Sequence, residues 1–158
     1  FFISKRDQGA SELPITDMRM TRFNISLEAG VDLVMFAIGH HLGGEIFIPK
    51  IPSYKIGDVA TAIAPNIKQI EIGIRPGEKL HEEMITATDA LNTIDLGEYY
   101  AILPSVSFKH QKDEYIKHHN AVMVPEGFHY SSDSNDQWES VESIREKIVE
   151  FVDPNFTV

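Results

Sequence analysis

The 158-residue chain contains no cysteine, which excludes a disulfide framework and any chemistry at a thiolate. It has no apolar run close to the roughly 20 residues that cross a bilayer, and no signal peptide is recognisable. With 42% hydrophobic and 24% charged residues, the composition is that of a globular protein with room for one domain. These features predict a cytoplasmic protein without a membrane partner.

Two nucleotide-binding motifs are also missing. No G-x-G-x-x-G and no Walker sequence occurs, and Gly43-Gly44 precedes a predicted strand instead of opening a helix. None of the five tyrosines is followed four residues later by lysine, the spacing of a reductase acid–base pair. We therefore expect this chain to contain neither a dinucleotide cradle nor a catalytic tyrosine–lysine pair.

The seven histidines do not form a metal-binding pattern. His40-His41 and His118-His119 are adjacent pairs, whose side chains point in different directions on a helix or strand. His81 begins a run that resembles a zinc-protease helix, but no second histidine follows four residues later. The sequence predicts no metal site.

The net charge of −10 is unevenly distributed. Residues 1–79 hold 9 basic and 9 acidic residues, whereas residues 80–158 hold 5 basic and 15 acidic ones. An acidic protein repels phosphodiester backbones, so nucleic acid is not an expected partner. A site for a small phosphate compound is expected in the first half, where Arg19, Arg22 and Arg75 lie.

Strand-like and helix-like segments alternate along the chain, which is typical of α/β packing with a partly parallel sheet. A helix is expected to begin at the cap Ser26, a second over residues 54–64 with Ser53 as its cap, and a last one after the capping-box pair Asp136 and Glu139. The other expected elements are a helix end at 1–6, extended segments at 13–16, 20–25, 45–49, 70–74 and 99–103, and a polar loop at 131–136.

Helical spacing of apolar residues predicts which side of each helix faces the core. The inward positions are expected to be Leu27, Val31, Val34, Met35 and Ile38 in the first helix, Ile56, Val59, Ala60 and Ile63 in the second, and Val141, Ile144, Ile148 and Phe151 in the last.

The most informative segment follows residues 70–74, where Arg75-Pro76-Gly77-Glu78 predicts a tight turn. An arginine at such a corner can grip phosphate oxygens in a fork, and a carboxylate three residues later can accept hydrogen bonds from sugar hydroxyls. The pair suits a nucleotide-sugar diphosphate. The alternative is a surface turn closed by a salt bridge.

Arg19 and Arg22 form a second basic pair. Three residues apart on a strand, they face opposite sides, so one of them can point into a site while the other serves the structure.

Three segments together resemble one enzyme family: LPITDMRMTRFNI at 13–25, GGEIFIPKIPS at 43–53 and GIRPGEKLHEEM at 73–84. They are similar to the inverting UDP-N-acetylglucosamine 4,6-dehydratases, bacterial extended short-chain dehydrogenase/reductases that begin pseudaminic acid biosynthesis for flagellin glycosylation. The resemblance extends from the first residue to Phe156. Since the chain starts with phenylalanine and not methionine, we expect a portion of a larger protein.

The resemblance implies an α/β fold, the C-terminal substrate-binding part of an NAD(P)-binding Rossmann-like enzyme with most of the Rossmann half absent. In the family, NADP, the tyrosine–lysine pair and the hydride chemistry of this lyase belong to the preceding half. Residues 1–158 would then be the UDP-sugar side, with no catalytic residue and no activity alone. The implied partners are UDP-N-acetylglucosamine, the N-terminal Rossmann half and further copies in a homo-oligomer.

The resemblance also assigns roles to individual residues. Arg22 and Arg75 would contact the diphosphate, and Glu78 the ribose hydroxyls. Met18 stands where relatives often have proline. The further substrate-binding candidates are Pro14 and Ile15, beside the uracil ring, and Met20 and Thr21, which adjoin Arg22.

Two other interpretations remain open at this stage. The chain could belong to a related capsule or N-glycan nucleotide-sugar dehydratase or epimerase, or be a non-catalytic, stand-alone binding module.

Overall fold

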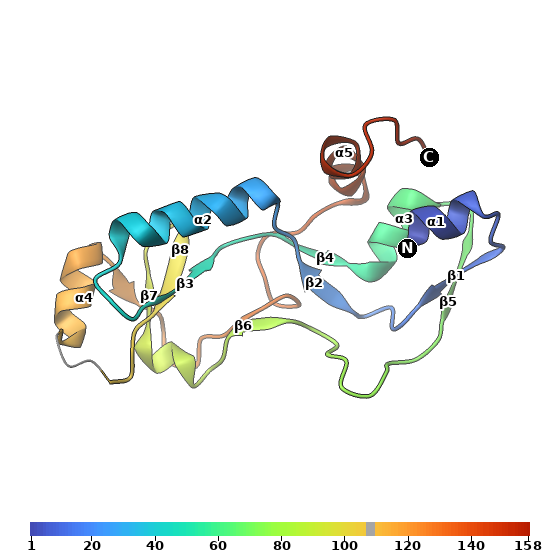
Figure 1. The fold of residues 1–158 in the computed structure, drawn as a ribbon. Coiled ribbons are helices and arrows are strands. Elements are labelled where there is room, and N and C mark those ends of the chain that lie inside the picture. The colour runs from blue at the N-terminus through green and yellow to red at the C-terminus, as the bar shows by residue number, and fades with distance from the viewer. Residues whose placement is uncertain (107–109) are drawn as a thin grey trace. The chain divides into compact units, whose positions relative to one another are not determined.

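The computed structural model describes residues 1–106 and 110–158, which form two compact units. Unit 1 comprises Phe1–Asn24, Pro52–Glu82 and Ser132–Val158, and unit 2 comprises Ile25–Ile51 and Glu83–Ser131. Each unit is therefore built from segments that are distant in the sequence, as the colours in Figure 1 show.

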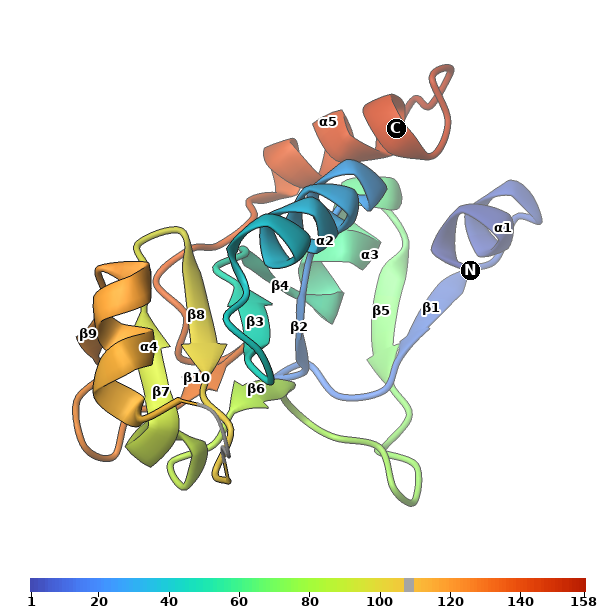
Figure 2. The ribbon, with the colours of Figure 1, turned by 60° about the vertical axis from the view of Figure 1, so that its left-hand side comes forward.

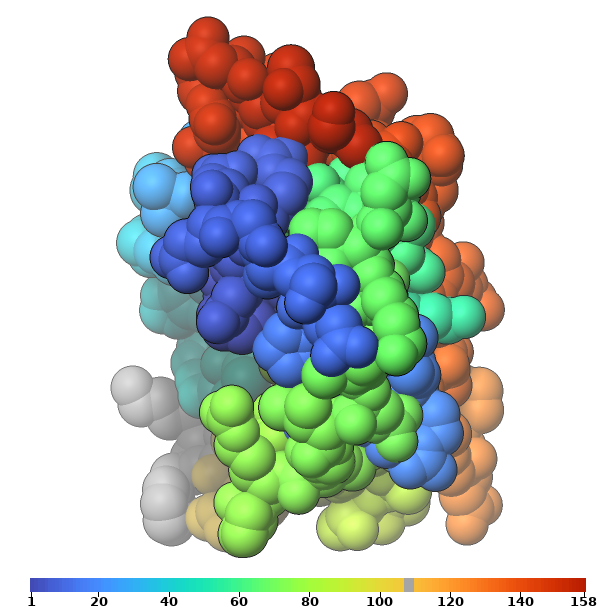
Figure 3. Space-filling model, turned by 90° about the vertical axis from the view of Figure 1, so that its right-hand side faces the viewer, coloured from blue at the N-terminus to red at the C-terminus, as the bar shows by residue number. Residues whose placement is uncertain are grey.

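Unit 1 contains two strand pairs and three helices. Strands β1 (Glu12–Ile15) and β5 (Lys68–Glu71) pair in parallel, and β2 (Thr21–Phe23) pairs antiparallel with β4 (Ser53–Lys55). In the space-filling view of Figure 3, the blue segment with β1 lies against the green segment with β5. The helices are α1 (Phe2–Asp7), α3 (Ile56–Ile63) and α5 (Val141–Phe151).

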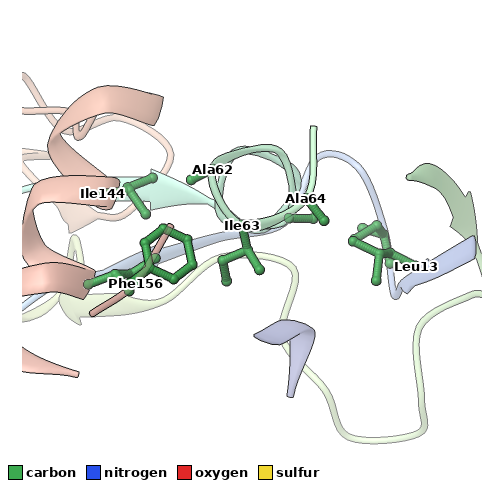
Figure 4. Close-up of a cluster of buried hydrophobic side chains, with 9 residues drawn as sticks. Leu13, Ala62, Ile63, Ala64, Ile144 and Phe156 are labelled. Atoms are coloured by element: carbon green, nitrogen blue, oxygen red, sulfur yellow. The ribbon is translucent and has the colours of Figure 1, made fainter. Parts of the chain in front are cut away.

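The core of unit 1 lies around α3. Figure 4 shows this helix between Leu13 on one side and Ile144 with Phe156 on the other. Leu13 is fully buried, and α5 contributes Ile144 and Ile148 to the same cluster. Burial of each such side chain stabilises the fold by about 1.5–3 kcal/mol, so the N-terminal, middle and C-terminal segments hold one another in place.

Unit 2 is organised around a four-stranded antiparallel sheet, seen from a second angle in Figure 2. The strand order is β3 (Ile46–Pro49), β8 (Tyr99–Ile102), β7 (Thr93–Asp95) and β9 (Val122–Met123). The unit also contains helices α2 (Leu27–His40) and α4 (Lys112–His119), the 3-10 turn η1 (Asp89–Asn92), and the antiparallel pair β6 (Glu83–Ile85) and β10 (Tyr130–Ser131).

Several predicted elements are confirmed because their signals are local. Ser26 caps α2 by accepting from the amide of Ala29 at 3.1 Å. The strand predictions at 13–16, 20–25, 45–49 and 99–103 correspond to β1, β2, β3 and β8. The parallel pairing of β1 with β5 agrees with the expectation of a partly parallel sheet.

The predicted start of the second helix was wrong. Ser53 does not cap α3, because residues Ser53–Lys55 form β4 and the helix begins only at Ile56. The backbone of Ser53 bonds to Gln137 and Glu139, which keeps it extended and fully buried. The strand expected at 70–74 is likewise displaced to Lys68–Glu71, since it pairs in register with β1.

The predicted cap of the last helix was also wrong. Ser140 is the N-cap of α5, and it forms a reciprocal capping box with Ser143. Glu139 is buried instead, where its carboxylate bonds to Lys147, Ser143 and Asn24. The segment expected as a polar loop at 131–136 begins in β10, and its Ser132 is fully buried.

The largest correction concerns the apolar side of α2. Its stripe was predicted to be core, yet α2 has no buried residue. Phe36 of this helix contacts the sheet of unit 2, since its ring stacks on Tyr99 at 4.2 Å and meets Phe47 edge-on. The stripe residues and their exposed fractions are Leu27 80%, Val31 53%, Val34 55%, Met35 62% and Ile38 64%.

Candidate functional site

The paired strands β2 and β4, here called the β2–β4 ribbon, have two chemically different faces. In their register, Arg22 lies opposite Tyr54 and Thr21 lies opposite Lys55. Because neighbouring residues of a strand point to opposite faces, Arg22 and Tyr54 share one face and Thr21 and Lys55 share the other. We call these the Arg22 face and the Lys55 face.

A chain segment that follows the Arg75–Glu78 turn runs along β2. The amide of Thr21 donates to the carbonyl of Leu80 at 3.2 Å. His81 Nδ1 lies 2.8 Å from Thr21 Oγ1, whereas Glu82 accepts from the amide of Phe23 and lies 3.7 Å from Arg22 Nε. His81 is thus associated with Thr21, and Glu82 with Arg22.

Arg22 is held firmly by this segment. Its Nη1 donates to the carbonyls of Thr21 at 2.6 Å and Leu80 at 3.1 Å, and its Nη2 donates to Lys79 at 2.9 Å. Only 19% of the side chain is exposed. Arg22 therefore fixes the chain immediately after Glu78, and part of its hydrogen-bonding capacity is already used by backbone carbonyls.

The pKa of Tyr54 depends on the burial and the charges at the Arg22 face. Burial, followed by the nearby carboxylate of Glu82, raises the pKa of the Tyr54 hydroxyl, and Arg22 offsets part of this shift. Tyr54 is therefore a neutral hydroxyl that can donate or accept a hydrogen bond at this face. The sequence did not identify it, because the residue was expected in a helix.

The turn predicted at Arg75-Pro76-Gly77-Glu78 is confirmed. Gly77 has φ of 81°, as the third position of such a turn requires, and the amide of Glu78 donates to the carbonyl of Arg75 at 3.0 Å. The carboxylate of Glu78 accepts from the Arg75 amide at 3.2 Å. Within residues 1–106 and 110–158, the exposed Arg75 guanidinium makes no ion pair, so the salt bridge of the alternative interpretation is not formed.

The structure thus brings part of the predicted set together. Arg22 donates to the carbonyls of Lys79 and Leu80, the two residues that directly follow the Arg75–Glu78 turn. Arg22 therefore lies beside the chain segment that continues from this turn. Thr21 adjoins Arg22 but faces the other side of the ribbon. Thr21 is also buried, and its hydroxyl is bonded to His81 and to Ser132 at 2.7 Å.

The remaining predicted substrate-binding residues, Pro14, Ile15 and Met20, have little solvent-exposed side-chain surface. Ile15 and Met20 are buried, and Pro14 is half-buried in β1. The carbonyl of Ile15 already accepts from the amide of Ile72 at 2.8 Å. Their predicted part in binding a uracil ring stays a prediction.

The other arginine of the predicted pair, Arg19, forms an ion pair within unit 1. Arg19 lies in a turn, with Nε and Nη2 bonded to the two carboxylate oxygens of Asp17 at 3.0 and 2.7 Å. The side chain of Arg19, and then its backbone amide, lower the pKa of Asp17 to about 2. Of the two arginines, only Arg22 contacts the segment that carries the predicted diphosphate turn.

Neither a membrane-spanning helix nor a cluster of metal ligands occurs among the described residues. None of the helices resolved in residues 1–106 and 110–158 is long and apolar enough to cross a membrane. Over the same ranges, no three acidic or histidine side chains converge as metal ligands do.

Comparison with known proteins identifies the class of this fold. Residues 1–104 match the model of the polysaccharide biosynthesis protein family, and the chain belongs to that family. The crystal structure of Pen from Bacillus thuringiensis superposes with a TM-score of 0.73 at 28% identity, over 94% of this chain and 44% of that one. The fold is that of the C-terminal part of an extended short-chain dehydrogenase/reductase.

The curated relatives are enzymes that act on nucleotide sugars. An inverting UDP-N-acetylglucosamine 4,6-dehydratase of Campylobacter jejuni is 49% identical over 151 residues, which are 94% of this chain and 45% of that enzyme. A UDP-glucose 4-epimerase of Rickettsia canadensis is 40% identical over 105 residues, 64% of this chain and 30% of the enzyme. The resemblance seen in the sequence is confirmed, and the chain spans less than half the length of these relatives.

Proposed function

We propose that residues 1–158 are the UDP-sugar side of a cytoplasmic, NADP-dependent, C5-inverting UDP-N-acetylglucosamine 4,6-dehydratase. Such an enzyme would carry out the first step of pseudaminic acid biosynthesis for flagellin glycosylation. Support comes from the similarity to the Campylobacter dehydratases over nearly the whole chain and from the chemistry of the Arg75–Glu78 turn in this sequence.

The observation that carries the proposal is the exposed guanidinium of Arg75, which makes no ion pair within the described residues and lies on a turn whose following residues are bound by Arg22. A dianionic diphosphate would supply the charged acceptors that this guanidinium lacks within the described residues, at about 1.5–3 kcal/mol for each charge-assisted hydrogen bond. Glu78, held by the backbone of the same turn, would accept from ribose hydroxyls.

Binding at this turn would serve a reaction that occurs elsewhere. UDP is remote from the reacting carbons of the sugar, and its binding energy can orient the sugar against a hydride acceptor. The connection between β4 and α3 does not suit the dinucleotide, because the strand runs directly into the helix at Lys55–Ile56 without a glycine-rich loop for a pyrophosphate. We assign NADP and the acid–base residues to the N-terminal half that the relatives possess, in an enzyme assembled as a homo-oligomer.

The test is the affinity of UDP for the complete enzyme and for its Arg75→Ala variant, measured by calorimetry. We expect a loss of roughly 10- to 100-fold, since each tenfold change corresponds to about 1.4 kcal/mol. Lys79→Ala is the matched control, because this exposed lysine, four residues away, contacts Arg22 only through its carbonyl. Equal UDP affinity in Arg75→Ala and the unmodified enzyme would remove the assigned role.

A second candidate reaction is epimerisation at C4 of a UDP-sugar, which the similarity to Rickettsia UDP-glucose 4-epimerases supports over 64% of the chain. The two reactions would share the UDP site and differ in product. A 4-keto-6-deoxy product from UDP-N-acetylglucosamine would support the dehydratase, and a C4 epimer would support the epimerase.

A further inference from the structure

The Lys55 face of the β2–β4 ribbon is hollowed, and it lies opposite the face that carries Arg22. Two hollows in unit 1 share Met18 and Lys55 among their lining residues. The first, about 410 Å³, also includes Gln69 and is called the Gln69 hollow; the second, about 690 Å³, includes Trp138 and is called the Trp138 hollow. Ligand pockets usually measure roughly 300–1,000 Å³.

The Gln69 hollow contains a buried acceptor with no donor. Gln69 Nε2 donates to the carbonyl of Gly57 at 3.1 Å and to Thr61 Oγ1 at 2.8 Å, which fixes the orientation of the amide. Gln69 Oε1 is left buried without a hydrogen bond from any described residue. An unsatisfied buried acceptor is costly, so a ligand hydroxyl that donates to Gln69 Oε1 would be favourable.

Lys55 is an unpaired cation between the two hollows. It is exposed, and within residues 1–106 and 110–158 its ammonium group makes no ion pair or hydrogen bond. In the Trp138 hollow Arg19 presents the guanidinium hydrogens that Asp17 does not use. The charge of Lys55, together with the donors of Arg19 that Asp17 leaves unused, favours an anionic group where the hollows adjoin.

Trp138 supplies a fixed apolar wall. Its indole Nε1 donates to the carbonyl of Asn135 at 2.7 Å, and 41% of the residue remains exposed. A ring held in this way can pack against the C–H face of a pyranose without losing side-chain entropy on binding. Asp58 lines one hollow and Asp133 the other, so both can accept from hydroxyls while disfavouring a highly charged polyphosphate.

We propose that the Lys55 face is a second ligand site of unit 1, specific for a sugar monophosphate and separate from the UDP site proposed at Arg75 and Glu78. The phosphate binds Lys55 and Arg19, a sugar hydroxyl donates to Gln69 Oε1, and the pyranose ring packs on Trp138.

The experiment uses Trp138, the only tryptophan of the chain, as an intrinsic fluorescence probe. Glucose 1-phosphate is titrated with UDP present at saturation, in parallel with glucose and with inorganic phosphate. We expect a saturable change with glucose 1-phosphate and at least tenfold weaker binding of the other two. Absence of a saturable change, or equal affinity for inorganic phosphate, would overturn the proposal.

Variants at two lysines test whether glucose 1-phosphate binds at the Lys55 face. Lys55→Met should weaken glucose 1-phosphate binding about tenfold or more, since one charge-assisted contact is lost. Lys68→Met should leave it unchanged, because Lys68 is an exposed strand lysine that pairs with Glu12 and lines neither hollow. A thermal melt of each variant checks that unit 1 is folded.

Arg75→Ala separates this proposal from the proposed function. Retained glucose 1-phosphate binding in that variant supports an independent site, whether or not UDP binding is lost. Loss of glucose 1-phosphate binding in Arg75→Ala would show a single shared site and contradict the inference.

Discussion

At the scale of single residues, neighbours in the sequence have different tasks because a strand alternates its faces. Thr21 is buried and its hydroxyl is bonded to His81 and Ser132, whereas Arg22, one position later, anchors the segment that follows the Arg75–Glu78 turn. The strand period of two explains this division, and the sequence could anticipate it only in outline. The partners of Thr21 and Arg22 on the two faces of β2 are supplied by β4 and by the segment after Glu78, which are distant in the sequence.

A buried pair in unit 2 makes its stability depend on pH. Glu45 and His119 are 3.0 Å apart, with side chains 0% and 2% exposed. Burial by itself would raise the pKa of Glu45, but bonds from the amides of Leu42 and Gly43 and from His119 outweigh it and leave the pKa below its ordinary 4.5. This carboxylate therefore stabilises unit 2 above pH 4.5, and the contribution is lost as the pH falls through the lowered pKa.

Glu45→Gln should lower the free energy of unfolding by about 1–3 kcal/mol at pH 7, because charged acceptors of buried N–H groups are replaced. The difference from the unmodified chain should shrink at pH 4 and below, and urea denaturation at several pH values measures it. Glu98→Gln is the control at an exposed carboxylate. A pH-independent difference would show that the ionised form of Glu45 is not what stabilises the unit.

At the scale of elements, α5 shows how a helix start is chosen. Both Asp136 with Glu139 and Ser140 with Ser143 have the spacing of a capping box, but only the serines form it. Glu139 is instead buried among Lys147, Ser143 and Asn24. Burial by itself would raise the pKa of this carboxyl, but the hydrogen bonds from these three residues outweigh it and leave the pKa lowered. The two local patterns predict different N-caps for α5, and the tertiary contacts of Glu139 determine that Ser140 is the N-cap.

Ser140→Ala should destabilise unit 1 by about 1 kcal/mol, the usual cost of a lost N-cap. Asp136→Ala should be close to neutral, because this exposed aspartate does not cap the helix. Urea unfolding followed by circular dichroism compares the two. The opposite ranking would mean that α5 starts four residues earlier.

At the scale of the whole molecule, the apolar stripe of α2 is an exposed apolar surface of unit 2. Its residues have helical spacing, and each is more than half exposed. Exposed apolar surface of this kind marks a place where another surface packs or where copies associate. The relatives are more than twice as long as this chain, so the stripe need not be exposed in a complete enzyme.

The 158-residue chain is expected to self-associate through this stripe. Replacing Val34 and Ile38 with glutamate should increase the monomer fraction in sedimentation velocity, without lowering the unfolding midpoint, since both side chains are already largely exposed. Ile72→Glu, at an exposed apolar residue of unit 1, is the control. A monomeric unmodified chain at all concentrations would contradict this prediction.

Local signals predicted much of the fold and part of the site. The Arg75–Glu78 turn and the Ser26 cap follow from the conformations of glycine and proline and from one side-chain hydrogen bond, so they needed no knowledge of distant segments. Ser53 was mistaken for a cap because its strand forms only by pairing with β2. Tyr54 and Glu82 were missed at the site for the same reason.

The sequence by itself determined the turn chemistry at Arg75 and Glu78, the alternation of strands and helices, and the similarity to nucleotide-sugar dehydratases. Only the tertiary structure decided that Arg22 is fixed by the carbonyls of Lys79 and Leu80, and that Lys55 and Trp138 line one hollow. The physical reason is range: backbone preferences and caps act within a few residues, whereas strand register and burial depend on segments far apart in the chain.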